Sequence, residues 1–127
     1  MRIFVLKSKL YTGRVTEANL NYEGSIVIDE DLMDAVGVRR FEKVLVANFT
    51  NGNRYETYAL KGGRGSGVIS VNGAGARYSC VGDRVTIFAF ADIDEHESLE
   101  PRIAILDEEN RITRQTAHGS THQIGAT

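Results

Sequence analysis

Short apolar runs separated by clusters of Gly, Asn and Asp dominate the chain. Runs rich in β-branched and aromatic residues occupy residues 3–6, 10–15, 25–28, 43–49, 54–60, 68–71, 84–91 and 103–106. Because runs bounded by turn residues are typical of strands, the pattern predicts a mainly β fold, a small barrel or sandwich. Asn51-Gly52 lies between two runs and predicts a tight hairpin, since both residues tolerate positive φ. Asn72-Gly73 repeats that signal.

One segment has the signals of a helix. Asp29 is a suitable N-cap, acidic residues follow it where the helix dipole favours negative charge, and Gly37 is a natural stop. The apolar positions of this helix form one buried stripe of Leu32, Met33 and Val36. Residues 94–99, before Pro101, fit either a second short helix or a solvated acidic loop.

Length and charge narrow the class of protein. A chain of 127 residues with 42% hydrophobic content suits one compact domain. The net charge is -2, with 15 basic and 17 acidic residues spread along the sequence, so neither nucleic acid nor a membrane is expected as a partner. The expected partner is a small molecule or another subunit.

Cysteine content and the two ends of the chain bear on its environment. Cys80 is the single cysteine, which excludes an intrachain disulfide and favours a reducing, cytoplasmic setting. The apolar run at residues 3–6 is too short for a signal peptide or a membrane span. The polar segment 114–127 is expected to be a flexible tail, which leaves residues 1–113 as the folded domain.

A serine that follows a glycine can undergo an uncommon reaction. Its hydroxyl can attack the glycine carbonyl and convert the peptide bond into an ester when the backbone is held in a strained turn. β-Elimination and hydrolysis then release ammonia and leave a pyruvoyl group at the new N-terminus. Gly-Ser occurs at Gly24-Ser25, Gly65-Ser66 and Gly119-Ser120, and the dipeptide alone favours an ordinary turn or linker at each place.

Three segments together distinguish the first of these sites. They are Tyr22-Glu23-Gly24-Ser25, Asn51-Gly52-Asn53-Arg54-Tyr55-Glu56-Thr57-Tyr58 and Ile69-Ser70-Val71-Asn72-Gly73-Ala74. In these segments, residues 1–113 resemble the pyruvoyl-dependent aspartate 1-decarboxylase family, whose members convert L-aspartate to β-alanine and CO₂ for pantothenate synthesis. The resemblance implies a double-psi β-barrel with one or two short helices, and a cytoplasmic homotetramer with sites between subunits.

The resemblance also assigns roles to individual residues. It implies autocatalytic cleavage between Gly24 and Ser25 into a β chain of residues 1–24 and an α chain of residues 25–127, whose pyruvoyl cofactor derives from Ser25. Thr57 and Asn72 match residues that assist processing, and Tyr58 matches the proton donor. The residues implied to bind substrate are Lys9, Arg54, Thr57, Gly73 and Ala74. No metal is implied.

These roles are chemically reasonable. The ketone of a pyruvoyl group can form a Schiff base with the substrate amine and accept the electrons that decarboxylation releases. Arg54 can bind a carboxylate through two charged hydrogen bonds, and Tyr58 is a weak acid that can deliver a proton. On a regular strand these two residues share a face about 13 Å apart. Thr57 faces the other way, so its role requires a twist or bulge near the strand end.

Three positions depart from the family pattern. Tyr11 stands where many members have histidine, Ala47 where an aromatic residue is frequent, and Gly75 where alanine is usual. The first two changes remove an ionisable imidazole and enlarge the pocket, so the preferred amino acid is hypothesised to differ from L-aspartate. A non-catalytic barrel that binds a ligand without self-cleavage is the alternative of another class.

Other candidate sites are weaker. His118 and His122 have i, i+4 spacing in the polar tail, and His96 lies among acidic residues, but neither arrangement indicates metal binding. Cys80 lacks an activating partner nearby in sequence, so a buried structural thiol is favoured over a nucleophile.

Overall fold

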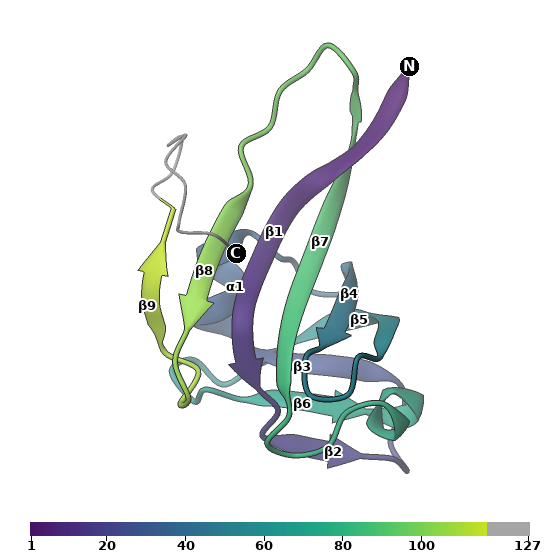
Figure 1. Cartoon of the computed structure of the whole chain (residues 1–127), viewed down its shortest axis with the longest axis vertical. Helices are drawn as coiled ribbons and strands as arrows, with labels where there is room; N and C mark the ends of the chain where they lie inside the picture. The colour runs from purple at the N-terminus through teal and green to yellow at the C-terminus, as the bar shows by residue number, and fades with distance from the viewer. Residues whose placement is uncertain (117–127) are drawn as a thin grey trace.

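The computed structural model describes residues 1–116, which form a mainly β structure with one α-helix (Figure 1). The strands are β1 (Arg2–Arg14), β2 (Glu17–Asn19), β3 (Ser25–Asp29), β4 (Lys43–Asn48), β5 (Arg54–Gly62), β6 (Ile69–Asn72), β7 (Arg84–Asp94), β8 (Arg102–Leu106) and β9 (Ile112–Gln115). The helix α1 spans Glu30–Val36, and a 3-10 turn, η1, spans Gly73–Arg77.

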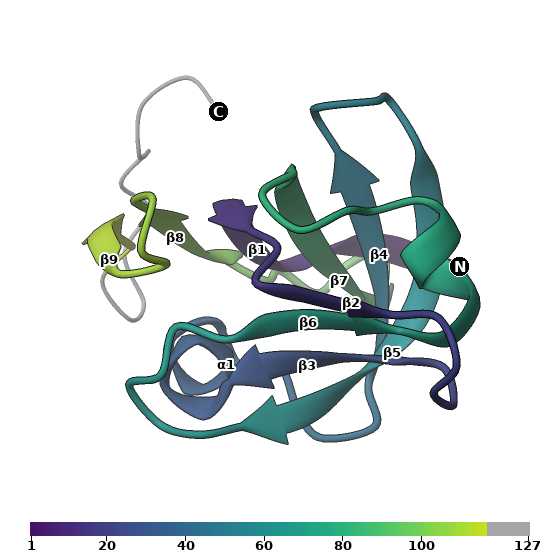
Figure 2. The ribbon, with the colours of Figure 1, turned by 90° about the horizontal axis from the view of Figure 1, so that it is seen from below.

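All the described strands belong to one curled sheet in the order β2-β6-β3-β5-β4-β7-β1-β8-β9. β3, β6 and β2 lie across the lower ends of β1 and β7, and Figure 2 shows the same arrangement from below. β3 is central to the site, because it pairs in parallel with β5 on one side and antiparallel with β6 on the other. The predicted mainly β fold, a small barrel, is confirmed.

The inner face of the curled sheet forms the core. Apolar residues of β1, β3, β4, β6 and β7 are fully buried there, among them Leu10, Ile26, Val46, Ile69 and Ile87. Along β7, Val85, Ile87 and Ala89 belong to this core, so the alternate residues Thr86 and Phe88 lie on the outer face. This alternation decides which functional side chains can meet.

The predicted helix is confirmed with both of its caps. The Asp29 Oδ1 atom accepts a hydrogen bond of 2.9 Å from the Asp31 backbone N–H, which satisfies one of the unpaired donors at the helix start. Gly37 ends the helix with a φ of 76°. The stripe of Leu32, Met33 and Val36 is buried as predicted.

Two of the apolar runs form a single strand, and two short strands were not predicted. Runs 3–6 and 10–15 belong to the single strand β1, which has register irregularities at Leu6/Ser8 and Leu10/Gly13 in its pairing with β7. The polar residues that interrupt the apolar pattern lie at this irregular part of the strand. β2 and β9 are short and largely polar, and pairing with β6 and β8 forms them rather than their own composition.

The turn predictions have mixed outcomes. Asn51-Gly52 connects the antiparallel strands β4 and β5, with Gly52 at φ 80°, so that hairpin is confirmed. The second hairpin is wrong, because β6 pairs with β2 and β3, and Gly73 begins the turn η1 instead. Residues 95–100 form a turn and an irregular loop, so the solvated-loop alternative is correct and the second α-helix is absent there.

The chain ends differ in what the structure describes. β9 continues to Gln115, two residues into the segment predicted as a flexible tail, because it pairs with β8. The rest of that segment, with His118 and His122, lies outside the described residues. No helix within residues 1–116 is long and apolar enough to cross a membrane.

Candidate active site

Ser25 lies at the start of β3, where the sheet brings it between two other strands. Its side chain is only 3% exposed although Gly24 before it is at the surface. Ser25 is the direct antiparallel partner of Asn72 on β6, and such pairs project their side chains to the same face. The Asn72 amide Nδ2 donates a hydrogen bond of 3.2 Å to the Ser25 hydroxyl oxygen.

Two further side chains orient the Asn72 amide. Its Oδ1 atom accepts hydrogen bonds from Asn19 Nδ2 at 3.1 Å and from the Ser70 hydroxyl at 3.2 Å. Because the Asn19 Nδ2 group can only donate, its bond requires a carbonyl oxygen at that position and directs the amide nitrogen of Asn72 toward Ser25. Sequence reasoning missed Asn19 and Ser70, since only the parallel pairing of β2 with β6 brings Asn19 beside Asn72.

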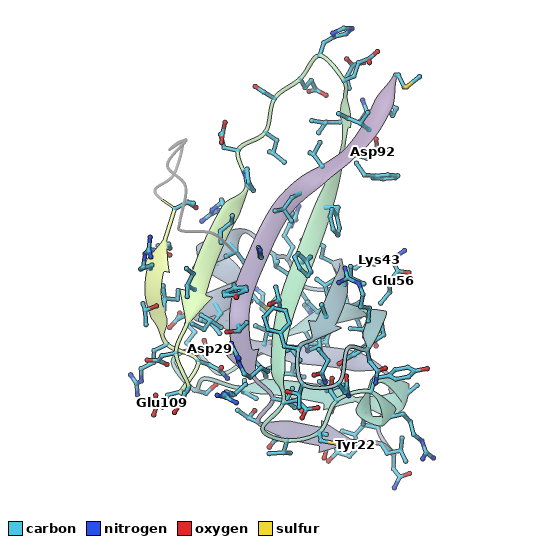
Figure 3. All side chains as sticks on the ribbon, in the orientation of Figure 1. Tyr22, Asp29, Lys43, Glu56, Asp92 and Glu109 are labelled. Carbon is cyan, nitrogen blue, oxygen red and sulfur yellow. The ribbon has the colours of Figure 1, made fainter. Side chains whose placement is uncertain are left out.

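The backbone around the Gly24-Ser25 bond is tightly enclosed on one side. Gly73 has a φ of 73°, and a Cβ atom there would lie 2.8 Å from the Gly24 Cα and N atoms and 3.0 Å from the Tyr22 carbonyl oxygen. Tyr22 lies at the lower edge of the molecule (Figure 3). A Cβ atom on Gly24 would have no neighbour within 4 Å, so the other side of that residue is open.

Tyr58 lies beside Ser25 through the parallel pairing of β5 with β3. The register pairs Ile26 with Ala59, which places Tyr58 next to Ser25 and on the same face of the sheet. The Tyr58 ring is half-buried, and its centroid lies 6.4 Å from that of Phe41. Within residues 1–116 its hydroxyl makes no hydrogen bond, which leaves the phenolic proton available.

Thr57 lies on the opposite face of β5. Its strand pairs regularly with β4 from Lys43↔Tyr58 to Ala47↔Arg54, and Thr57 is the partner of the buried Val44. The bulge that its predicted role requires is absent from this pairing. The structure therefore brings Ser25, Tyr58 and Asn72 to one face but does not bring the Thr57 side chain to that face.

Lys9 and Arg54 converge on one aromatic ring. The Lys9 Nζ atom lies 5.6 Å and the Arg54 Cζ atom 5.9 Å from the centroid of Phe88, and Lys9 Nζ lies 5.2 Å from that of Tyr11. Neither cation has an acidic partner in the part of the chain that the structure describes. Burial lowers the pKa of Lys9 below its ordinary value. Two cations without a carboxylate make a suitable anion site.

Two of the three residues that depart from the family pattern, Tyr11 and Ala47, lie in the same region. Ala47 is the cross-strand partner of both Arg54 and Thr86, and it is almost fully buried. The Tyr11 ring packs edge-on against Phe49, at a centroid distance of 5.6 Å. The small side chain at position 47 and the phenol at position 11 therefore shape the surface around Arg54. Ala74, predicted to contact substrate, is exposed in η1 directly after Gly73.

Known proteins resemble the chain along most of its length. A profile described as aspartate decarboxylase matches residues 1–113. A protein from Exiguobacterium sibiricum named aspartate 1-decarboxylase is 52% identical over 121 residues, covering 94% of this chain and 95% of its own. Proteins of the same name from Caldicellulosiruptor bescii and Ruminiclostridium cellulolyticum are 53% and 46% identical, over 90% and 98% of this chain and 91% and 98% of their own.

The chain belongs to the aspartate decarboxylase family. It is accordingly an enzyme, a decarboxylase of the lyase class. Among residues 1–116, no group of three or more His, Cys, Asp or Glu side chains is placed to hold a metal ion. The prediction of a buried thiol at Cys80 is wrong, because this side chain is exposed after the turn of residues 73–78.

Proposed function

We propose that the chain cleaves itself between Gly24 and Ser25, and that the pyruvoyl group formed from Ser25 decarboxylates L-aspartate to β-alanine and CO₂ in pantothenate biosynthesis. The observation that carries the proposal is the hydrogen bond of 3.2 Å between Asn72 Nδ2 and the buried Ser25 hydroxyl, next to Gly24, which Gly73 encloses on one side and which is open on the other. Relatives named aspartate 1-decarboxylase support the choice of substrate.

Cleavage begins at the serine side chain. The Ser25 Oγ atom attacks the Gly24 carbonyl carbon, the carbon–nitrogen bond breaks, and the hydroxyl proton ends on the freed Ser25 amine. Loss of the Ser25 α-proton then breaks the Cβ–Oγ bond, so Gly24 leaves as a carboxylic acid and residue 25 becomes dehydroalanine. Its enamine tautomerises to an imine, water adds, and ammonia departs to leave the ketone.

Asn72 can assist the second of these steps. As the Cβ–Oγ bond breaks, negative charge develops on the oxygen to which the Asn72 amide N–H already points. The bonds from Asn19 and Ser70 hold the amide in that orientation before the reaction, so no reorganisation is needed. Gly73 keeps the Gly24 backbone in place because it packs directly against it.

A pyruvoyl group at residue 25 fits these surroundings, because the position is buried and has an amide donor within hydrogen-bond distance. Such a group supplies a carbonyl-conjugated ketone, which acts as the electron acceptor when the substrate loses its carboxylate. Tyr58, on the same face, delivers a proton to the substrate α-carbon. Lys9 and Arg54 bind carboxylate, and Gly73 and Ala74 contribute backbone to the wall of the site.

The proposal includes a quaternary structure. We propose that the chain forms a homotetramer whose active sites lie between subunits. Several large apolar side chains are exposed on the single chain, whereas soluble monomers expose few large apolar patches. This exposure supports burial of these side chains against other subunits. They include Phe4, Tyr22, Phe41, Tyr78 and Phe90. The tetramer is proposed to act in the cytoplasm, and the folded unit of residues 1–113 is cut into segments 1–24 and 25–127 on maturation.

A second candidate substrate follows from Ala47 and Tyr11. The small residue beside Arg54 leaves room for a longer side chain, and the phenol replaces an ionisable group, so an amino acid other than L-aspartate is the alternative. Steady-state kinetics with L-aspartate, L-glutamate and apolar amino acids distinguish the two. A higher kcat/KM for L-aspartate supports the leading proposal, and a higher value for another amino acid supports the alternative.

Ser25→Ala and Tyr58→Phe test the proposed mechanism. CO₂ release and chain length are measured together on the parent and both variants. Ser25→Ala is expected to remain uncut and without activity. Tyr58→Phe is expected to be cut normally but to lose about 10²-fold in kcat, because only the proton donor is removed. Decarboxylation by uncut Ser25→Ala protein would refute the proposed cofactor.

A further inference from the structure

Tyr55 lies on the inner face of β5, next to the turn that encloses the Gly24-Ser25 bond. Its phenol oxygen is 2.6 Å from the Ser79 hydroxyl oxygen, and its ring stacks on Tyr78 with centroids 5.6 Å apart. Burial raises the pKa of Tyr55, so the phenol stays neutral and keeps this hydrogen bond. The ring is therefore fixed at both its edge and its face.

The partners of Tyr55 are themselves anchored. Ser79 is almost fully buried, and the Asn48 Nδ2 atom donates to its hydroxyl at 3.2 Å and to the Tyr78 carbonyl oxygen at 3.0 Å. The same amide donates to Asp83 Oδ2 at 2.8 Å. This network connects residues 78–83 to Asn48 at the end of β4. A shift of the Tyr55 ring would therefore break its hydrogen bond with the anchored Ser79.

The fixed ring limits what residue 75 can be. A Cβ atom on Gly75 would lie 3.0 Å from Tyr55 Cε2 and 3.0 Å from Val71 Cγ1, which is closer than an ordinary contact. Gly75 belongs to η1, and its carbonyl oxygen accepts the hydrogen bond from the Tyr78 N–H that closes the turn. Gly75 thus lets η1 pack directly on the Tyr55 ring.

The same turn begins at the cleavage site. Gly73 is the first residue of η1, and it packs against Gly24 closely enough to exclude a Cβ atom. A shift of η1 by a few tenths of an ångström therefore moves the wall of the Gly24-Ser25 bond. Small displacements of reacting groups reduce rates strongly even when the fold is retained.

We propose that Tyr55 is a positioning residue for self-cleavage: held by Ser79 and Tyr78, it supports η1 through Gly75 and so fixes Gly73 against Gly24. This inference rests on the proposed self-processing at Ser25. It gives a reason for the glycine at position 75, because the tethered ring leaves no room for a methyl group there.

The test compares self-cleavage rates of parent, Gly75→Ala, Tyr55→Phe and the double variant, followed by intact mass after rapid purification of the full chain. Gly75→Ala is expected to slow cleavage about tenfold, because its methyl group displaces η1 from the tethered ring. Tyr55→Phe removes the bond to Ser79 and lets the ring yield. The double variant is therefore expected to recover most of the parent rate, and Ser79→Ala is expected to rescue Gly75→Ala in the same way.

Gly62→Ala is the matched control. Its Cβ atom would collide with Val68 Cγ1 at the other end of β5, so the substitution overpacks the structure away from η1. It is expected to lower the melting temperature without slowing cleavage. Rescue by Tyr55→Phe is a result that loss of stability alone does not produce, since removing a buried hydrogen bond does not restore stability lost elsewhere.

The outcomes separate the two claims. A parent chain that stays uncut overturns the proposed function and this inference with it. A parent that is cut, with Gly75→Ala cut at the same rate, overturns the inference alone. Slow cleavage in Gly75→Ala that neither Tyr55→Phe nor Ser79→Ala relieves also overturns it, because the tether would then have no part in the effect.

Discussion

Gly73 and Gly24 pack backbone to backbone, at a separation that excludes a Cβ atom on Gly73: that atom would lie 2.8 Å from both the Cα and the N of Gly24. The contact joins the end of β6 to the residue before β3, where Asn72 also holds Ser25. Gly24 is therefore packed closely on one side and open on the other. The close contact restricts movement of its backbone, and the open side leaves the residue accessible.

This contact predicts that Gly73→Ala blocks self-cleavage. The new methyl group collides with backbone, which cannot give way as a flexible side chain does, and the φ of 73° adds about 1 kcal/mol of strain. Gly52→Ala is the control, since Gly52 has a φ of 80° but open space around it. Both variants should lose stability in thermal unfolding, whereas only Gly73→Ala should remain uncut. Equal cleavage of the two would contradict the steric account.

Asn72→Ala is expected to slow cleavage by about 10²-fold or more, because it removes the N–H that points to the Ser25 oxygen. Asn19→Ala leaves that donor in place and removes only the bond that orients it, so a loss of about tenfold is expected. Gel densitometry of the uncut chain against time measures both rates. If Asn19→Ala were as slow as Asn72→Ala, orientation rather than donation would dominate.

Lys9→Met is expected to raise KM for a dicarboxylic amino acid more than it lowers kcat, since Lys9 is assigned to binding. The lowered pKa of Lys9 sets the pH dependence of KM. The ammonium group loses its proton below the ordinary pKa of 10.5, so the KM of the parent should rise as the pH increases toward that value. The Lys9→Met variant should lack this rise. A pH-independent KM in the parent would remove Lys9 from the binding site.

Thr86→Val is expected to stabilise the protein by about 1 kcal/mol, because the Thr86 hydroxyl is buried without a hydrogen-bond partner among residues 1–116. Valine keeps the shape and removes the unpaired polar atom. Urea unfolding of the cut and uncut proteins measures the change. A loss of stability on this substitution would mean that the hydroxyl has a partner in the assembled protein.

Tyr55 predicts a pH dependence of stability. Burial raises its folded-state pKa above 10.0; the hydrogen bond with Ser79 opposes this shift, and the charge of Asp83 adds to it. The unfolded phenol therefore ionises first, so its contribution is complete below pH 10 and is lost as pH rises through the folded-state pKa. As the pH rises above about 10, the parent should lose more unfolding free energy than Tyr55→Phe. Equal losses would contradict burial of a neutral phenol.

Much of the fold could be predicted from local sequence. Gly52 and Gly37 act at turns whose conformation depends on their immediate neighbours, and Asp29 caps the helix that directly follows it. The hairpin predicted at Asn72-Gly73 is wrong because the Asn-Gly dipeptide has two different roles in this fold. At residues 51–52 it forms a hairpin turn, and at residues 72–73 it allows a close approach of two backbones. Only the pairing of β6 with β3, far apart in sequence, distinguishes the two.

Resemblance to the family predicted only part of the candidate site. Ser25, Asn72 and Tyr58 meet as expected, whereas Thr57 obeys the alternation of a regular strand and faces the other way. Asn19 gave no signal, because its role depends on a three-residue strand formed by pairing alone. Phe88 likewise reads as an ordinary strand residue until two cations meet over its ring.

Intact mass spectrometry of the purified chain after prolonged incubation tests the central claim most directly. The account predicts two fragments, one of residues 1–24 ending in a free acid and one of residues 25–127 lighter by one ammonia than its sequence requires. A chain that stays whole would contradict self-processing. Two fragments whose larger member retains an intact serine would contradict formation of the pyruvoyl group.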